Sequence, residues 1–104
     1  MLFPIHYLDH AMRLTEQERQ TIKQVIQCYD EQAQILLFGS RADAEKKGGD
    51  IDLLVISQTL GFADKLNILA DLHGELGDQK IDIVLDRDGS GDFARTVLPT
   101  AIKL

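Results

Sequence analysis

Three aspartates lie inside otherwise apolar segments of this sequence, and their type and spacing suit metal-assisted chemistry. Asp50 and Asp52 open the run Asp-Ile-Asp-Leu-Leu-Val-Ile-Ser, and Asp82 lies between Ile81 and Ile83. Side chains alternate across a strand, so Asp50 and Asp52 share one face, with Cα atoms about 6.5 to 7 Å apart. Such acids repel one another and resist desolvation, and divalent cations offset both effects. Because the ligands are hard oxygens without His or Cys, we expect Mg²⁺ or Mn²⁺ rather than Zn²⁺.

A second group, Gly39-Ser40-Arg41, directly follows the apolar run 35–38. Glycine lets the backbone approach a ligand closely, and the amides that follow suit phosphate oxygens. Ser40 adds a hydroxyl donor, and Arg41 adds a guanidinium that can bind phosphate through two hydrogen bonds. A Gly-Ser pair alone is most often an ordinary turn, and a lone Asp is common in turns as well. The linked arrangement, with nine residues between Ser40 and Asp50, indicates a phosphate and metal site.

The elements that must position these residues follow from hydropathy and capping patterns. Thr15 followed by Glu18 is a capping-box pattern and predicts a helix start. An apolar face at three-and-four spacing then continues to Tyr29. Strands are predicted at 35–38, at 50–57 as the central strand, and at 81–85. We expect a helix at about 64–76 that ends at Gly77, and a short helix at 92–98 that Pro99 interrupts. On the helix at 64–76, the predicted apolar side consists of Leu66, Leu69, Ala70 and Leu76.

The order helix, strand, strand, helix, strand, helix predicts an α/β (α+β) fold, a small mixed sheet flanked by helices. The 104 residues are interpreted as one domain, 1–104, with a radius of gyration of about 13 Å. A core of this size is modest. A homo- or hetero-oligomer is therefore compatible with the sequence.

Composition narrows the classes of function. The chain has 17 acidic and 11 basic residues, a net charge of −6, and this balance argues against stable nucleic-acid binding, which depends on rows of Lys and Arg. No apolar stretch reaches the roughly 18 to 20 residues of a membrane span, and the first ten residues do not resemble a signal peptide. The expected localisation is cytoplasmic. Cys28 is the only cysteine and is predicted to be a packed, inert thiol on the apolar helix face.

These residues resemble a known family. Phe38-Gly39-Ser40-Arg41, the Asp50-Ile51-Asp52 pair and Asp82 look like the Gly-Ser, Asp-x-Asp and distant-Asp signature of the polymerase-β-like nucleotidyltransferases. The short chain is similar to their minimal form, known as the antitoxin half of HEPN/MNT toxin-antitoxin pairs.

The resemblance implies an activity and a partner. Asp50, Asp52 and Asp82, the acidic triad, would bind two Mg²⁺ ions, with Asp82 helping to activate the attacking hydroxyl. Gly39 and Ser40, with Arg41, would hold the phosphates of ATP. The protein would transfer AMP from ATP to a tyrosine hydroxyl of a cognate HEPN toxin. This modification would neutralise the toxin.

One departure from the family pattern concerns the phosphate site. The family often continues Gly-Ser-Arg-Ala-Arg-Gly, whereas Asp43 stands where the second arginine is expected. Lys46 and Lys47 lie in the same loop and could substitute, or could be a solvated charge run. Two other functions stay open. One is a small-molecule, antibiotic-type adenylyltransferase that needs a second subunit, and the other is an antitoxin that neutralises its partner by binding alone.

The histidines are weak candidates. His6 and His10 have the i, i+4 spacing of a metal chelate, but only one acid flanks them, and we expect no metal site there. His73 is predicted to be a surface or boundary residue.

The segment after the third strand is also interpreted structurally. Asp86, Asp88, Ser90 and Gly91 imitate the start of a calcium loop, but Val97 occupies the twelfth position, where a bidentate Glu is needed. An acidic turn is the prediction. The final apolar set either packs on the sheet or binds a partner; it consists of Phe93, Val97, Leu98 and Ile102.

Overall fold

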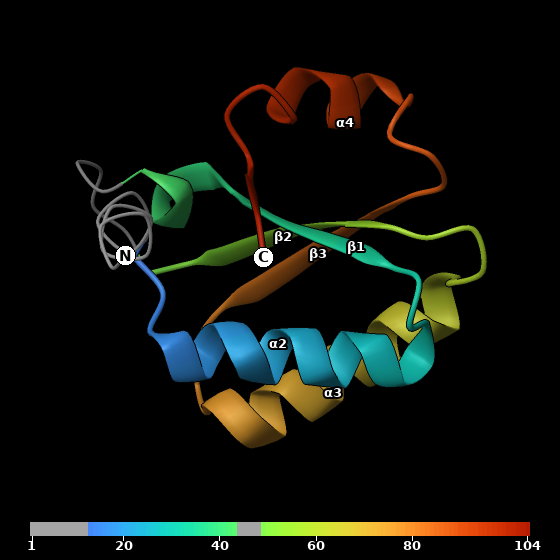
Figure 1. Cartoon of the computed structure of the whole chain (residues 1–104). Coiled ribbons are helices and arrows are strands. Elements are labelled where there is room, and N and C mark those ends of the chain that lie inside the picture. Colours follow the sequence, from blue (N-terminus) through green and yellow to red (C-terminus); the bar gives the residue numbers. More distant parts are fainter. Residues whose placement is uncertain (1–12, 44–48) are drawn as a thin grey trace, which may run out of the picture.

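The chain forms a four-stranded mixed sheet with helices on both faces (Figure 1). The structure, a computed structural model, describes residues 13–43 and 49–104. Its elements in chain order are α2 (Glu16–Tyr29), β1 (Gln34–Phe38), the 3₁₀ turn η1 (Gly39–Ala42), β2 (Ile51–Ile56), α3 (Phe62–Leu76), β3 (Ile81–Asp86), α4 (Asp92–Val97) and β4 (Ile102–Lys103). The predicted α/β (α+β) class is confirmed.

The strand order across the sheet is β3-β2-β1-β4. β1 is antiparallel to β2 and β4, whereas β2 is parallel to β3 and is joined to it through α3. β2 therefore lies in the interior of the sheet, as predicted for segment 50–57, and β3 forms one edge. The predicted strands and helices are all present, and β4 is an addition that the sequence analysis did not include.

Local signals account for the start of α2. The Thr15 hydroxyl oxygen accepts a hydrogen bond of 3.0 Å from the Glu18 backbone N–H, and the Glu18 carboxylate accepts one of 2.9 Å from the Thr15 backbone N–H. This reciprocal pair is the predicted capping box. It fixes the first turn of the helix, from which Ile22 and Ile26 reach the core and are fully buried.

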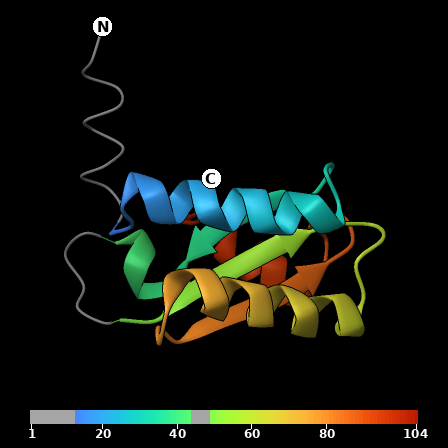
Figure 2. The ribbon, with the colours of Figure 1, turned by 90° about the horizontal axis from the view of Figure 1, so that it is seen from below.

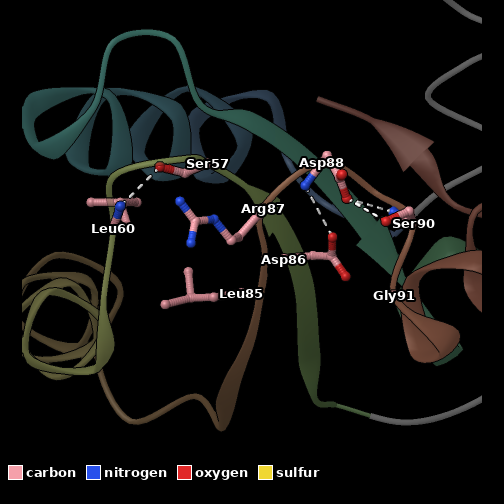
Figure 3. A pocket seen from close by; sticks show the side chains of 8 residues that line it. All are labelled: Ser57, Leu60, Leu85, Asp86, Arg87, Asp88, Ser90 and Gly91. Atoms are coloured by element: carbon pink, nitrogen blue, oxygen red, sulfur yellow. Dashed lines mark hydrogen bonds between the residues drawn. The ribbon is translucent and has the colours of Figure 1, made fainter.

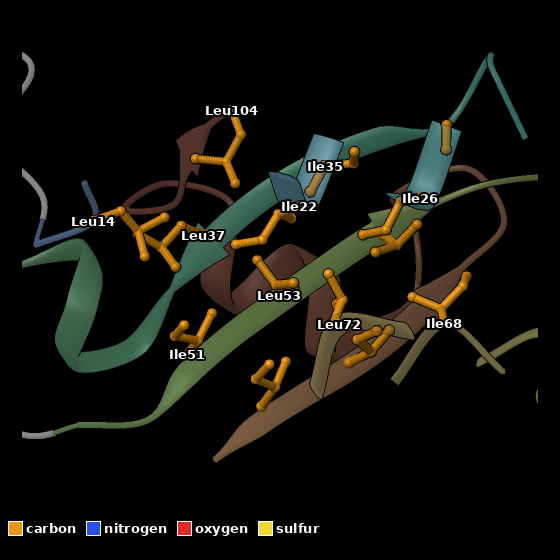
Figure 4. Close-up of a cluster of buried hydrophobic side chains, with 14 residues drawn as sticks. Leu14, Ile22, Ile26, Ile35, Leu37, Ile51, Leu53, Ile68, Leu72 and Leu104 are labelled. Atoms are coloured by element: carbon orange, nitrogen blue, oxygen red, sulfur yellow. The ribbon is translucent and has the colours of Figure 1, made fainter. Parts of the chain in front are cut away.

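The larger part of the core lies between the sheet and the helices α2 and α3. Figure 2 shows these two helices side by side over one face of the sheet, and Figure 4 shows the apolar side chains gathered beneath them. Ile51, Leu53 and Val55 of β2 point into this layer. On the opposite face, α4 covers a smaller cluster built on Leu36, Leu54 and Ala94 (Figure 1). The apolar layer under α2 and α3 is thus larger than the layer under α4.

The C-terminal apolar set packs on the sheet for the most part. Val97 and Leu98 are partly buried against the cluster under α4, and Ile102 against the larger cluster. Phe93 is the exception, with 47% of its surface exposed.

The predicted apolar side of α3 was right for Leu69 and Leu76 and wrong for Leu66 and Ala70, and the predicted packing of Cys28 was wrong. α3 buries Ile68 and Leu72, with Leu69 and Leu76 partly buried, whereas Leu66 is 51% exposed and Ala70 is also exposed. The buried strip passes through 68 and 72 because these positions face α2 and the sheet. Cys28, predicted to be packed, is exposed. It lies two residues after Ile26, about 200° around the helix, and so faces solvent.

None of the described helices is long and apolar enough to cross a membrane.

Candidate active site

The acidic triad gathers at one end of the parallel strand pair. Asp52 in β2 and Asp82 in β3 are paired in register. Neighbouring strands lie about 4.8 Å apart, and laterally paired residues point to the same face. Asp50 directly precedes β2, and its side chain is about half exposed. The structure therefore brings Asp52 and Asp82 side by side, with Asp50 next to them.

Asp52 and Asp82 face the same side of the sheet as α4. Leu54 and Val84 lie two residues beyond Asp52 and Asp82, and both belong to the cluster under α4. Strand alternation places the two acids on that face as well. Ile51 and Leu53 point to the opposite face and anchor β2 in the larger cluster. The acids are thus held by a rigid strand whose other face is buried.

The charges of the triad act on one another. Partial burial raises the pKa of Asp52, and the negative charges of Asp82 and Asp50 raise the pKa further. The ammonium group of Lys80 opposes this effect, and its Nζ lies 3.7 Å from Asp50 Oδ2. Asp52 is therefore an acid in a region of excess negative charge.

The Gly-Ser turn (Gly39 and Ser40) lies directly against Asp52. Phe38, the last residue of β1, pairs with Asp52 across the antiparallel ladder, and the next residue, Gly39, has a φ of +77°. A Cβ on Gly39 would overlap Asp52 Oδ2 and lie 3.2 Å from its Cγ. Only glycine fits this position without moving the acid. The two halves of the predicted site are therefore in contact.

The guanidinium of Arg41 is held by partners outside the acidic triad. Its guanidinium donates to the carbonyl oxygens of Arg13 at 2.7 Å and of Gly49 at 3.1 Å, and to Gln79 Oε1 at 3.0 Å. It also lies 3.9 Å from a carboxylate oxygen of Glu18 in α2. These contacts fasten η1 to α2 and to the loop before β3. Contact of Arg41 with phosphate stays a prediction, and it requires the guanidinium to leave these partners.

Other predicted candidates lie outside the site or outside the described residues. Lys46, Lys47, His6 and His10 belong to segments that the structure does not describe. His73 is exposed on α3, and its Nε2 lies 3.1 Å from the carbonyl oxygen of Gln79.

The donor set suits a hard cation in its chemistry. Asp52 and Asp82 lie side by side with Asp50 next to them, and partial burial together with these acidic neighbours raises the pKa of Asp52, which is the imbalance that a divalent cation corrects. Across residues 13–43 and 49–104, however, no three His, Cys, Asp or Glu side chains are gathered closely enough to hold a metal ion. Asp50, Asp52 and Asp82 are the residues that would hold one, and their carboxylates would have to move closer together.

A hollow lies at the other end of the parallel pair, where β2 and β3 finish (Figure 3). There the Asp86 carboxylate accepts hydrogen bonds from the backbone N–H groups of Asp88 and Gly89, and the Asp88 carboxylate accepts from the N–H and hydroxyl of Ser90. These acids stabilise their own turn, as predicted for this segment. The side chain of Arg87 extends along this hollow (Figure 3).

The comparison with protein families decides how the site is interpreted. A family model described as Polymerase beta, Nucleotidyltransferase matches residues 20–104. The chain belongs to this family. The match includes the Gly-Ser turn, the acidic triad and every strand of the sheet. A search of curated proteins found no match. Membership in the nucleotidyltransferase family supports nucleotidyl transfer as the general activity, with a nucleoside triphosphate and a divalent metal as the family's usual requirements.

Two features of the candidate site were not predicted from the sequence. Lys80 lies beside Asp50, and the pairing of Ile51 with Ile81 would have placed it there if the register of β2 and β3 had been known. The second feature is an edge-to-face contact between the rings of Phe38 and Phe93, with centroids 5.3 Å apart. No periodic pattern links these two residues, because they come from β1 and α4.

Proposed function

We propose that this nucleotidyltransferase transfers AMP from ATP to a tyrosine hydroxyl of a cognate HEPN toxin, and that it acts as the antitoxin of the pair. The observation that supports the transfer is the contact of the Gly-Ser turn with Asp52, which is itself in register with Asp82. A phosphate-binding turn and a row of acids on one rigid face are what nucleotidyl transfer requires. The partner rests on the resemblance to the minimal family members.

Each residue has a role in the proposed reaction. The turn at Gly39 and Ser40 holds the triphosphate next to Asp52. The acceptor oxygen forms a bond to the α-phosphorus, the bond to pyrophosphate breaks, and Asp82 helps to activate the attacking hydroxyl. Two Mg²⁺ ions, when bound by the triad, would lower the pKa of that hydroxyl and stabilise the leaving pyrophosphate.

The exposure of the triad favours an acceptor on a macromolecule. Asp82 is exposed on an edge strand, and the side chain of Asp50 is about half exposed. A tyrosine on the surface of another protein can approach the triad from solvent.

The test uses the full chain, its purified HEPN partner, Mg²⁺ and ATP labelled at the α-phosphate. Wild type is expected to label the partner, and ATP labelled at the γ-phosphate is expected to leave it unlabelled. Asp52→Asn should lower the labelling rate at least about a thousandfold, equivalent to ~4 kcal/mol of barrier. Glu75→Gln is the matched control, because Glu75 is an exposed carboxylate on α3, on the other face of the sheet.

Three results would contradict the proposal. Full labelling by the Asp52→Asn variant would remove the triad from the reaction. Neutralisation of the toxin without any label would indicate an antitoxin that acts by binding alone. Label on a small-molecule hydroxyl and none on the partner would indicate the antibiotic-type activity.

A further inference from the structure

We infer that the ring of Phe93 is the surface on which the nucleobase of the donor nucleotide stacks. This inference rests on the proposed function, because it assigns the base end of the same nucleotide whose phosphates lie at the Gly-Ser turn. It makes Phe93 a positioning residue and gives α4 a part in choosing the donor.

The argument begins with a row of side chains across the sheet. Phe38 pairs with Asp52, and Asp52 pairs with Asp82. All three therefore lie side by side on β1, β2 and β3 and point to the face that α4 covers. One end of the row is aromatic and the other is acidic.

Phe93 extends the aromatic end of this row. Its ring lies 5.3 Å from that of Phe38, centroid to centroid, with the ring planes at 72°. This edge-to-face contact is a favourable geometry for two aromatic rings and fixes the orientation of Phe93. Phe38 is also the residue directly before Gly39. Phe38 thus joins the phosphate-binding turn, its neighbour in the chain, to the ring of Phe93, its neighbour in space.

The ring of Phe93 remains accessible on this face. It is 47% exposed, although Ala94 beside it is fully buried. The edge-to-face contact with Phe38 therefore leaves about half of the Phe93 surface open to solvent, and a second flat ring can stack there. The other large exposed apolar side chains of the described residues, Phe62 and Leu66, lie on α3, on the opposite side of the sheet. Within residues 13–43 and 49–104, Phe93 is therefore the large exposed aromatic ring on the face that carries Asp52 and Asp82.

The chemistry of this surface suits a nucleobase. Stacking of a base on an aromatic side chain strengthens binding by roughly 5- to 150-fold. Neither Phe38 nor Phe93 offers a hydrogen-bonding group to a base edge. The expected selectivity is therefore for purines over pyrimidines through the larger stacking area, with weak discrimination between adenine and guanine.

The test is calorimetric titration of the full chain with ATP, and separately with inorganic tripolyphosphate, each with Mg²⁺. Phe93→Ala should weaken ATP binding about tenfold or more and leave tripolyphosphate binding unchanged. Phe93→Tyr should restore the affinity for ATP, whereas Phe93→Leu should fold like wild type and still bind ATP weakly. Phe62→Ala is the matched control, since it removes an exposed phenylalanine from the opposite side of the sheet and should change neither titration.

The outcomes separate this inference from the proposed function. ATP affinity within twofold of wild type in both the Ala and Leu variants would overturn the inference, as would an equal loss of ATP and tripolyphosphate binding. Absence of ATP binding by wild type would overturn the inference and the proposed function together. A Phe93-dependent preference for ATP without any labelling of the partner would overturn the proposed acceptor alone.

Discussion

Replacing Gly39 by alanine tests the contact between the Gly-Ser turn and Asp52 of the acidic triad. Gly39 has a φ of +77°, which costs a residue with a Cβ about 1–3 kcal/mol. The new methyl group would also overlap the Asp52 carboxylate, and turning that side chain out of its rotamer costs about 0.5–1.5 kcal/mol. The two effects together predict a loss of about 1.5–4.5 kcal/mol in the free energy of unfolding.

The measurement is urea unfolding of a double-mutant cycle with Gly39→Ala and Asp52→Ala. In the Asp52→Ala background the carboxylate is gone, so Gly39→Ala should cost only the backbone part, and the coupling between the two sites should be about 0.5–1.5 kcal/mol. Equal costs in both backgrounds would refute the proposed contact.

Gly77→Ala provides a control for activity. Gly77 has a φ of +80°, yet a Cβ there would meet nothing within 4 Å. Both substitutions should destabilise the fold, but only Gly39→Ala should abolish nucleotidyl transfer under conditions in which the protein remains folded. A comparable loss of activity in Gly77→Ala would show that general strain, rather than displacement of Asp52, is responsible.

Two further predictions concern Asp52 and Arg41. Because folding raises the pKa of Asp52, this carboxyl favours the folded state at low pH, and the contribution is lost as the pH rises through the raised pKa. Asp52→Asn should therefore be more stable than wild type to urea at pH 7 without metal, with the difference closing toward about pH 3; lower stability at pH 7 would contradict this. Arg41→Lys loses the forked contacts with Gly49 and Gln79 and should destabilise the protein by about 1–3 kcal/mol in urea. Unchanged stability with weaker tripolyphosphate binding would instead place this guanidinium on phosphate.

Much of the fold and the arrangement of the site could be predicted from local signals. The Thr15 capping box depends on residues three apart and is visible in the sequence. The shared face of Asp52 and Asp82 follows from strand alternation together with the parallel β2-α3-β3 unit, in which equivalent strand ends lie together. The roles of these residues as metal ligands stay predictions.

Features set by tertiary contacts could not be predicted. The apolar residues of α3 form two overlapping faces, one through Leu66 and one through Ile68. Packing against α2 and the sheet decides that the face with Ile68 is the buried one. Arg41 could direct its guanidinium to phosphate or to carbonyl groups from distant segments, and the sequence does not distinguish them. β4 has only two residues, too few for an alternating pattern to be recognised.

The position of β3 at the edge of the sheet has a consequence for how the site can tighten. Asp52 is carried by a strand with hydrogen-bonded neighbours on both sides, whereas Asp82 is carried by a strand whose described pairing is with β2 alone. The position of Asp52 is therefore fixed, whereas the position of Asp82 can adjust. Any inward shift that brings the three carboxylates within reach of a shared ligand is expected to come from β3, because such a shift bends an outer strand and leaves the centre of the sheet in place.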